Sequence, residues 1–172
     1  DLDALKRAVS ERTAALLITN PEDTGIFNPE VSDWVRVVHE AGGLCSYDQA
    51  NANGILGITR AREAGFDVCH FNIHKTFSTP HACGGPGAGA VGVTAAMAPF
   101  LPRPVIERSG ERFVLDDDRP LSIGKVRPWL GVVPNLVRAY AWVMSMGAEG
   151  LCEVAETAVL NNNYLMRRVL EI

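Results

Sequence analysis

The residues that most clearly suggest chemistry are an acid and a lysine, each placed where a predicted strand ends. Asp48 follows the predicted strand 44–47, and Lys75 comes 27 residues later, shortly after the predicted strand 66–71. A lysine amine forms a Schiff base with an aldehyde cofactor, and a carboxylate pairs with a protonated ring nitrogen. Pyridoxal phosphate requires both groups, so the pair predicts a site for this cofactor. The alternative is that Asp48 caps a loop and Lys75 is a solvated surface residue.

Two neighbours strengthen the cofactor interpretation only if Lys75 is the cofactor lysine. His74 directly precedes it, and its imidazole could then donate to the cofactor phosphate. Ala50 follows Asp48 by two residues, which on a strand places both on one face, and a small side chain there would let a flat ring lie close. The chain has three lysines, Lys6, Lys75 and Lys125, so the candidates for amine chemistry are few.

The elements that would position these residues alternate between strand and helix. Residues 2–11 have helical spacing, residues 14–19 predict a buried strand, and residues 20–28 are rich in turn formers. A helix is expected next, with Asn28 as its cap and Pro29 in its first position. Strands at 44–48 and 66–71 flank a weaker predicted helix at 55–65. This alternation predicts a parallel α/β sheet whose strand ends bring Asn20, Asp48 and residues 72–75 to one edge.

The second half of the chain has a different character. Residues 83–92 contain five glycines, which indicates a flexible or closely approached backbone near Lys75. The run 87–92 fits G-x-G-x-x-G, but no strand precedes it, so we reject a dinucleotide site. Prolines at 99–104 suggest a boundary, Ser109-Gly110 suggests a hairpin, and helices are expected over 135–146 and 149–170.

A metal site is the competing hypothesis for the region around the lysine. Cysteine and histidine side chains are concentrated there, as Cys69, His70, His74, His81 and Cys83. His70 and His74 would share a face if they lay on one helix. A strand running into a loop over 66–75 spoils that spacing. The four cysteines show no CxxC motif, which favours free thiols in a reducing cytoplasm.

Composition narrows the class of protein. The 172 residues are 47% hydrophobic and 21% charged with a net charge of −4, which indicates a globular fold. No basic tract supports nucleic-acid binding, and no apolar run is long enough to span a membrane. Because the chain begins at Asp1 without a methionine, we interpret it as a fragment.

The segment around the lysine resembles the cofactor-lysine region of glycine decarboxylase, the P-protein of the glycine cleavage system. The resemblance rests on residues 70–81 (HFNIHKTFSTPH) and 84–89 (GGPGAG), and continues through 17–21, 24–25, 47–51, 122–128, 137–140 and 158–164. It covers essentially the whole chain, and the tail resembles the separately encoded subunit 2 more than the single long chain. It departs at Gln49, Cys83 and Ala90, where the family has Gly, Gly and Pro, and again over 131–134.

This resemblance implies a fold type I pyridoxal-phosphate enzyme. Residues 1–99 would be part of the large cofactor-binding domain, and 100–172 the hairpin and helices leading into the smaller C-terminal α+β domain. It implies Lys75 as the Schiff-base lysine and Asp48 as partner of the pyridine nitrogen. Ala50 would lie against the ring, His74 near the phosphate, and Asn20 or Thr24 at the ring hydroxyl or the substrate.

The activity so implied is that of a glycine dehydrogenase, an oxidoreductase that decarboxylates glycine and transfers the aminomethyl group to the lipoyl arm of the H-protein. A heterotetramer with subunit 1 is the expected assembly, and the segment by itself is expected to be inactive. Two alternatives stay open. One is another fold type I enzyme, a cysteine desulfurase or an aminotransferase, and the other is a metal-binding or structural subunit.

Overall fold

The structure is a computed structural model that describes residues 1–81 and 87–172. Its elements follow the chain in the order α1 (Leu2–Ala8), β1 (Ala15–Thr19), α2 (Val31–Glu40), β2 (Leu44–Gln49), β3 (Val68–Asn72), α3 (Ile73–Thr76), β4 (Gly89–Val93), the 3-10 turn η1 (Ala98–Phe100), β5 (Val105–Ser109), β6 (Arg112–Asp116) and α4 (Val133–Leu170).

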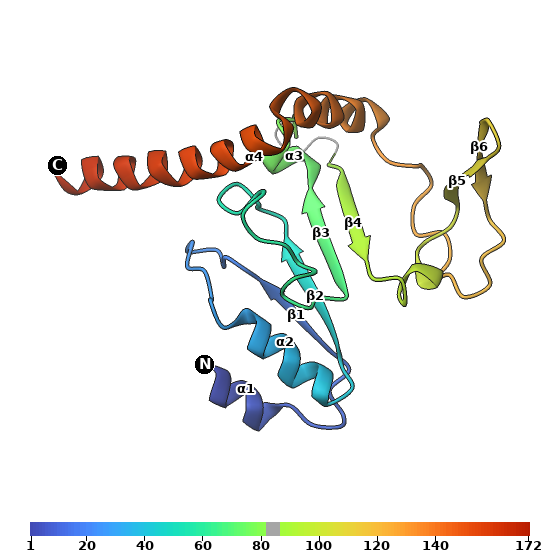
Figure 1. Cartoon of the computed structure of the whole chain (residues 1–172), viewed down its shortest axis with the longest axis horizontal. Coiled ribbons are helices and arrows are strands. Elements are labelled where there is room, and N and C mark those ends of the chain that lie inside the picture. The colour runs from blue at the N-terminus through green and yellow to red at the C-terminus, as the bar shows by residue number, and fades with distance from the viewer. Residues whose placement is uncertain (82–86) are drawn as a thin grey trace.

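The central element is a four-stranded sheet in the order β1-β2-β3-β4 (Figure 1). β1, β2 and β3 are parallel, and β4 runs antiparallel to β3. The predicted α/β architecture is therefore confirmed, with an antiparallel edge strand added. β4 lies in the glycine-rich run, where a Cβ on Gly89 would come within 3.2 Å of the Phe71 carbonyl oxygen. The run 87–92 thus contributes a strand and no strand-turn-helix unit, as expected from the rejected dinucleotide motif.

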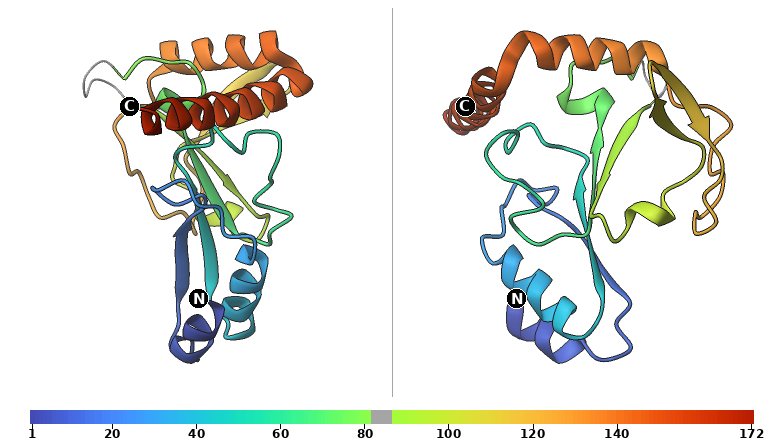
Figure 2. Two further views of the ribbon diagram at one scale, coloured as in Figure 1. Left: turned by 90° about the vertical axis from the view of Figure 1, so that its left-hand side faces the viewer. Right: turned by 45° about the vertical axis from the view of Figure 1, so that its right-hand side comes forward.

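One face of this sheet is covered by α2 (Figure 2, left). Val31, Val35 and Val38 repeat at helical spacing, and all three are buried against the side chains of Cys45 and Tyr47 on β2. The Tyr47 ring stacks on Phe66 with their centroids 4.5 Å apart. Alternation along β2 sends Leu44, Ser46 and Asp48 to the opposite face, which is far more exposed.

Two local predictions are wrong. α2 begins at Val31 rather than after Asn28, because the Asn28 side chain accepts a hydrogen bond from the Glu30 N–H and forms a turn before the helix. Residues 55–65 form no helix. They make separate hydrogen-bonded turns, and Gly57 and Gly65 have φ values of +75° and +92°, which are left-handed and incompatible with a continuous helix.

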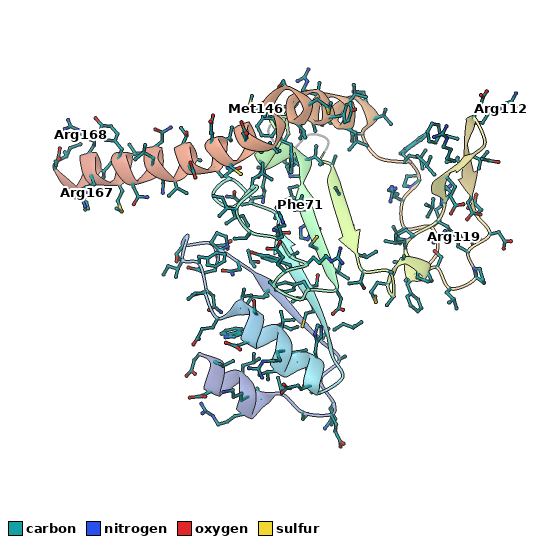
Figure 3. The ribbon with its side chains drawn as sticks, in the orientation of Figure 1. Phe71, Arg112, Arg119, Met146, Arg167 and Arg168 are labelled. Atoms are coloured by element: carbon teal, nitrogen blue, oxygen red, sulfur yellow. The ribbon has the colours of Figure 1, made fainter. Side chains whose placement is uncertain are left out.

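The C-terminal helical region crosses the carboxyl ends of the strands. α4 consists of two helical halves that meet at Gly147, whose φ of 66° and ψ of −178° are not helical. The two helices predicted for 135–146 and 149–170 are thus confirmed, as is the β5–β6 hairpin. Phe77 makes edge contacts with Phe71 of β3 and Trp142 of α4, which join the sheet to the first half of α4. Figure 3 shows Phe71 on β3, below the part of α4 that carries Met146. No helix among residues 1–81 and 87–172 has the length and apolar character to cross a membrane.

Candidate active site

Asp48 lies near the carboxyl end of β2, directly opposite His70 of β3 in the parallel register. The Asp48 side chain is 41% exposed, on the sheet face that α2 does not cover. Its Oδ1 atom accepts a hydrogen bond of 2.8 Å from the Ala50 N–H and lies 3.3 Å from His70 Nε2. No described residue donates to Oδ2, so one carboxylate oxygen is available to a ligand. β2 ends at Gln49, so Ala50 lies in the bend that follows and not on the strand with Asp48.

Lys75 lies on α3, the single helical turn that continues from β3 (Figure 1). Ile73 and Thr76 face inward and are buried, while Lys75 is exposed. Among the described residues, nothing forms an ion pair or hydrogen bond with its amine. Lys6, by contrast, pairs with Asp3 at 3.6 Å.

A buried hydrogen bond joins the two segments that carry Asp48 and Lys75. The Ala52 N–H, four residues beyond Asp48, donates to Oγ1 of Thr76 at 3.0 Å. The Thr79 hydroxyl then donates to the Ile73 carbonyl at 2.8 Å, which holds the far side of α3. Both threonines are buried, so these bonds are protected from water. The ends of β2 and β3 are therefore fixed relative to each other.

His74 is held against the glycine-rich segment. Its Nδ1 lies 3.2 Å from both the nitrogen and the carbonyl oxygen of Ala88, and its ring lies 4.1 Å from the His81 ring. A Cβ on Gly87 would sit 3.2 Å from His74 Cε1, so glycine allows this close approach. The imidazole thus connects α3 to the segment that leads into β4.

Asn20 and Thr24 belong to the loop after β1. The buried Asn20 amide donates to the Asn28 carbonyl at 3.1 Å and accepts from the Asn28 N–H at 2.8 Å, which closes the loop. Thr24 is exposed and bonded to Glu22 through both its hydroxyl and its N–H, and these bonds lower the pKa of the Glu22 carboxyl. The structure therefore shows Asn20 closing a loop and Thr24 in an exposed turn, and their expected cofactor contacts stay predictions.

Three features of this region were missed by the sequence reasoning. His70 was considered only as a metal ligand, although its strand position opposite Asp48 was implied by the two predicted strands. No role was assigned to Thr76 from the sequence. Ser78, three residues after Lys75, has φ of 56°, a strained conformation for a residue with a side chain.

Gln49, one of the departures from the family pattern, is buried, and its Oε1 has no hydrogen-bond partner among the described residues. Of the other two departures, Ala90 lies in β4, and Cys83 lies outside the described residues.

The metal hypothesis for Cys69, His70, His74, His81 and Cys83 stays a prediction, because Cys83 lies outside the described residues. Within the described ranges, the one group of three potential ligands is His39, Cys45 and Asp67, at the opposite end of the sheet. Asp67 Oδ2 already accepts from both His39 Nε2 and the Cys45 N–H, each at 2.8 Å. Burial and the Asp67 charge raise the pKa of the Cys45 thiol to about 11. The raised thiol pKa disfavours the thiolate that a metal requires, and Asp67 Oδ2 already accepts two hydrogen bonds, so we interpret this trio as a structural cluster.

A depression of about 410 Å³ lies between α2 and residues 63–65. None of the predicted cofactor residues lines it, and Ser32, Val35 and Glu40 on one wall with Glu63 on the other offer no amine. The depression therefore does not include the residues expected to hold the cofactor.

The residues at the strand ends fit pyridoxal phosphate. The cofactor needs an acceptor for its ring N–H and an amine for its aldehyde. Asp48 Oδ2 and Lys75 Nζ are both without partners among the described residues, and both lie at the same edge of the sheet. The Ala52–Thr76 bond holds their segments together.

The fold is shared with solved structures of glycine decarboxylase and cysteine desulfurase. The chain is similar to the crystal structure of glycine decarboxylase (P-protein) of the glycine cleavage system, with a TM-score of 0.80 and 20% identity over 95% of this chain and 39% of that chain. The cysteine desulfurase CsdA from Escherichia coli gives 0.56, with 19% identity over 87% of this chain and 37% of that one.

In sequence the chain is similar to proteins named as probable glycine dehydrogenase (decarboxylating) subunit 2. The probable glycine dehydrogenase (decarboxylating) subunit 2 of Caldanaerobacter subterraneus subsp. tengcongensis is 52% identical over 98% of this chain and 35% of the relative. The same-named protein of Pyrococcus abyssi is 53% identical over 98% of this chain and 34% of the relative. The chain thus spans about a third of the length of these relatives. No protein-family model matches it. The resemblance seen in the sequence is confirmed.

Proposed function

We propose that this chain carries the cofactor lysine and its partner acid in a pyridoxal-phosphate-dependent glycine decarboxylase of the glycine cleavage system. The observation that supports the proposal most directly is the joining of two adjacent strand ends, where the Ala52 N–H bonds Thr76 and so holds the Asp48 segment to the Lys75 helix. The sequence similarity to glycine dehydrogenase subunit 2 supports glycine as the substrate.

In this proposal each residue has a separate task. Lys75 supplies the primary amine that attaches the cofactor aldehyde. Asp48 Oδ2 accepts the hydrogen bond of the ring nitrogen and holds the proton there, because its negative charge favours the cationic ring. When bound, pyridoxal phosphate accepts the electron pair that remains as glycine loses CO2.

The remaining assignments concern shape and orientation. His74 is fixed by Ala88 and is proposed to face the phosphate, and Ala50 to lie against the ring. Asn20 and Thr24 are retained as candidate contacts of the ring hydroxyl or substrate. The aminomethyl group would pass to the lipoyl arm of an H-protein, with subunit 1 as the expected partner in a heterotetramer.

The proposal is tested on the intact protein together with its partner subunit. Pyridoxal phosphate is added, the visible spectrum is recorded before and after borohydride, and the reduced adduct is mapped by peptide mass spectrometry. We expect one adduct, on Lys75, which is lost in Lys75→Ala and retained in the matched Lys6→Ala control. An adduct on Lys6 or Lys125, or none, would refute the cofactor assignment.

The substrate is tested separately. Release of labelled CO2 from carboxyl-labelled glycine, stimulated by lipoylated H-protein, is the expected result. The competing activity is that of a cysteine desulfurase, whose structure is also similar but with a lower TM-score. Sulfur release from cysteine without CO2 release from glycine would establish that alternative instead.

A further inference from the structure

His70 faces the carboxylate of Asp48 across the parallel β2–β3 pair. The register places the two residues directly opposite each other, and both side chains lie on the face that α2 leaves uncovered. His70 Nε2 lies 3.3 Å from Asp48 Oδ1, and each side chain is about two-fifths exposed. His70 also precedes Lys75 by only five residues, so one short segment carries both groups.

The chemistry of the contact determines which atom carries the proton. An ionised carboxylate only accepts hydrogen bonds, so Nε2 must be the protonated nitrogen of the ring when it faces Oδ1. The same oxygen accepts the Ala50 N–H at 2.8 Å. The Ala50 N–H therefore bonds Oδ1 from one segment, and the His70 ring approaches the same oxygen from the neighbouring strand. Oδ2 receives no donor from the described residues and stays available.

The separation is longer than in a comparable pair of the same molecule. His39 Nε2 lies 2.8 Å from Asp67 Oδ2, which is 0.5 Å closer than the His70–Asp48 contact. Hydrogen bonds of reacting groups are often long in ligand-free structures and shorten when the ligand binds. The His70 ring is thus within a small rotation or shift of a full hydrogen bond.

We propose that His70 is a positioning residue for Asp48, which holds Oδ1 so that Oδ2 presents to the ring nitrogen of the cofactor. The proposal rests on the proposed function, because it needs a cofactor at Lys75. His70 touches neither substrate nor cofactor in this role. It acts through the orientation of the carboxylate, and its removal matters only while Asp48 is present.

A double-mutant cycle on the intact protein tests this, with the dissociation constant of pyridoxal phosphate as the readout. His70→Leu removes the donor and keeps an apolar volume, and we expect binding to weaken about tenfold, the effect of losing one hydrogen bond to a charged group. In an Asp48→Ala background the same substitution is expected to change the constant less than twofold. Additive effects in the cycle would overturn the positioning role.

Rescue and control variants separate positioning from general damage. His70→Gln keeps an N–H donor at similar reach and is expected to restore binding to within about threefold of the wild type. His39→Leu removes the histidine of the other pair and should leave the constant unchanged. If His70→Gln binds as weakly as His70→Leu, the donor is not what matters and the proposal fails.

The borohydride adduct distinguishes a failure of the His70 role from a failure of the proposed function. An adduct on Lys75 in the wild type, with unchanged cofactor affinity in His70→Leu, would overturn the role of His70 and leave the proposed function intact. Absence of any Lys75 adduct in the wild type would overturn both. If His70→Leu fails to fold by circular dichroism, the comparison of His70→Gln with a His70→Asn variant, whose donor is shorter, supplies the same decision.

Discussion

Two histidine–aspartate pairs lie at opposite ends of the same strands, and their surroundings give them different capacities. Asp67 Oδ2 accepts from His39 and from the Cys45 N–H, and its side chain is only 17% exposed. Asp48 accepts the Ala50 N–H on Oδ1, faces His70 at 3.3 Å, and is 41% exposed. Each carboxylate leaves one oxygen without a described donor, so the two pairs differ in exposure and position: Asp67 is largely buried before β3, and Asp48 is accessible near the carboxyl end of β2. Residue type alone does not make a site, since exposure and position in the sheet distinguish the two pairs.

The two pairs also lie at different ends of the sheet. Asp67 precedes β3, and its carboxylate connects the end of α2 to the start of β2, which serves packing. Asp48 comes near the carboxyl end of β2, beside the helix that carries Lys75. Ligands of open α/β sheets bind outside the carboxyl ends of the strands. The comparison therefore predicts that substitutions at one end change chemistry and at the other change stability.

The largest effect is expected for Lys75→Ala in the intact protein. Without the amine no covalent attachment of the cofactor is possible, so decarboxylation should fall at least about a thousandfold. The free energy of unfolding should not change measurably, because Lys75 is exposed and has no ion pair or hydrogen bond with any described residue. Turnover of glycine and a thermal melt check both parts. A Lys75→Ala enzyme with wild-type turnover would remove the lysine from the mechanism.

The next effect separates the two carboxylates directly. Asp48→Ala should keep the Lys75 adduct but lower turnover by about a thousandfold, because the ring nitrogen loses the charge that holds its proton. Asp67→Ala should leave turnover per folded molecule almost unchanged. Equal losses of turnover in the two variants would contradict the division between the strand ends. The measurement is the rate of CO2 release at saturating cofactor.

Much of this division was visible in the sequence. The acid and the lysine at two strand ends were found from the apolar runs that precede them, and the parallel strands followed from the strand-helix alternation. What the sequence could not supply was the surroundings of each carboxylate. Which oxygen of Asp48 or Asp67 is bonded, and how exposed each side chain is, depends on groups such as the Ala50 and Cys45 N–H, whose positions are fixed only by the folded chain.

The local errors have the same origin. Asn28 was expected to cap α2, yet its side chain bonds Glu30 in a turn, because an asparagine can satisfy a nearby N–H without starting a helix. Residues 55–65 were predicted to form a weak helix, but the left-handed Gly57 interrupts them and the left-handed Gly65 ends them, so that they form separate turns. Asn20 lies at the edge where it was expected, but the buried bonds of its amide to Asn28 could not be foreseen.

A smaller effect is expected on the stability contributed by the His39–Asp67 pair. Asp67→Ala removes the acceptor of the Cys45 N–H and of His39, which should lower the free energy of unfolding by about 1–3 kcal/mol. Asp48→Ala should cost less than about 1 kcal/mol, since its more exposed donors can turn to water. Urea unfolding of both variants measures the difference. A larger loss for Asp48 than for Asp67 would reverse the assignment of roles.

The smallest effect concerns the reactivity of the Cys45 thiol, which lies beside His39 and Asp67. Burial and the neighbouring Asp67 charge raise the pKa of Cys45 to about 11, from an ordinary value of 9.0. A raised thiol pKa means that the reactive thiolate is scarce below pH 11, and at pH 8 its fraction falls about a hundredfold. Iodoacetamide at pH 8 should therefore label Cys152, which is only partly buried, well before Cys45.

The same labelling experiment asks whether the cluster is a metal site. A metal bound by His39, Cys45 and Asp67 would require the thiolate, so zinc would protect Cys45 and a chelator would expose it. We expect neither zinc nor chelator to change its rate, because the proton stays on sulfur and the carboxylate already holds two donors. Asp67→Asn should speed labelling, since it removes a charge that raises the pKa. Zinc-dependent protection of Cys45 would show instead that His39, Cys45 and Asp67 bind a metal, and the contrast between the two pairs would then fail.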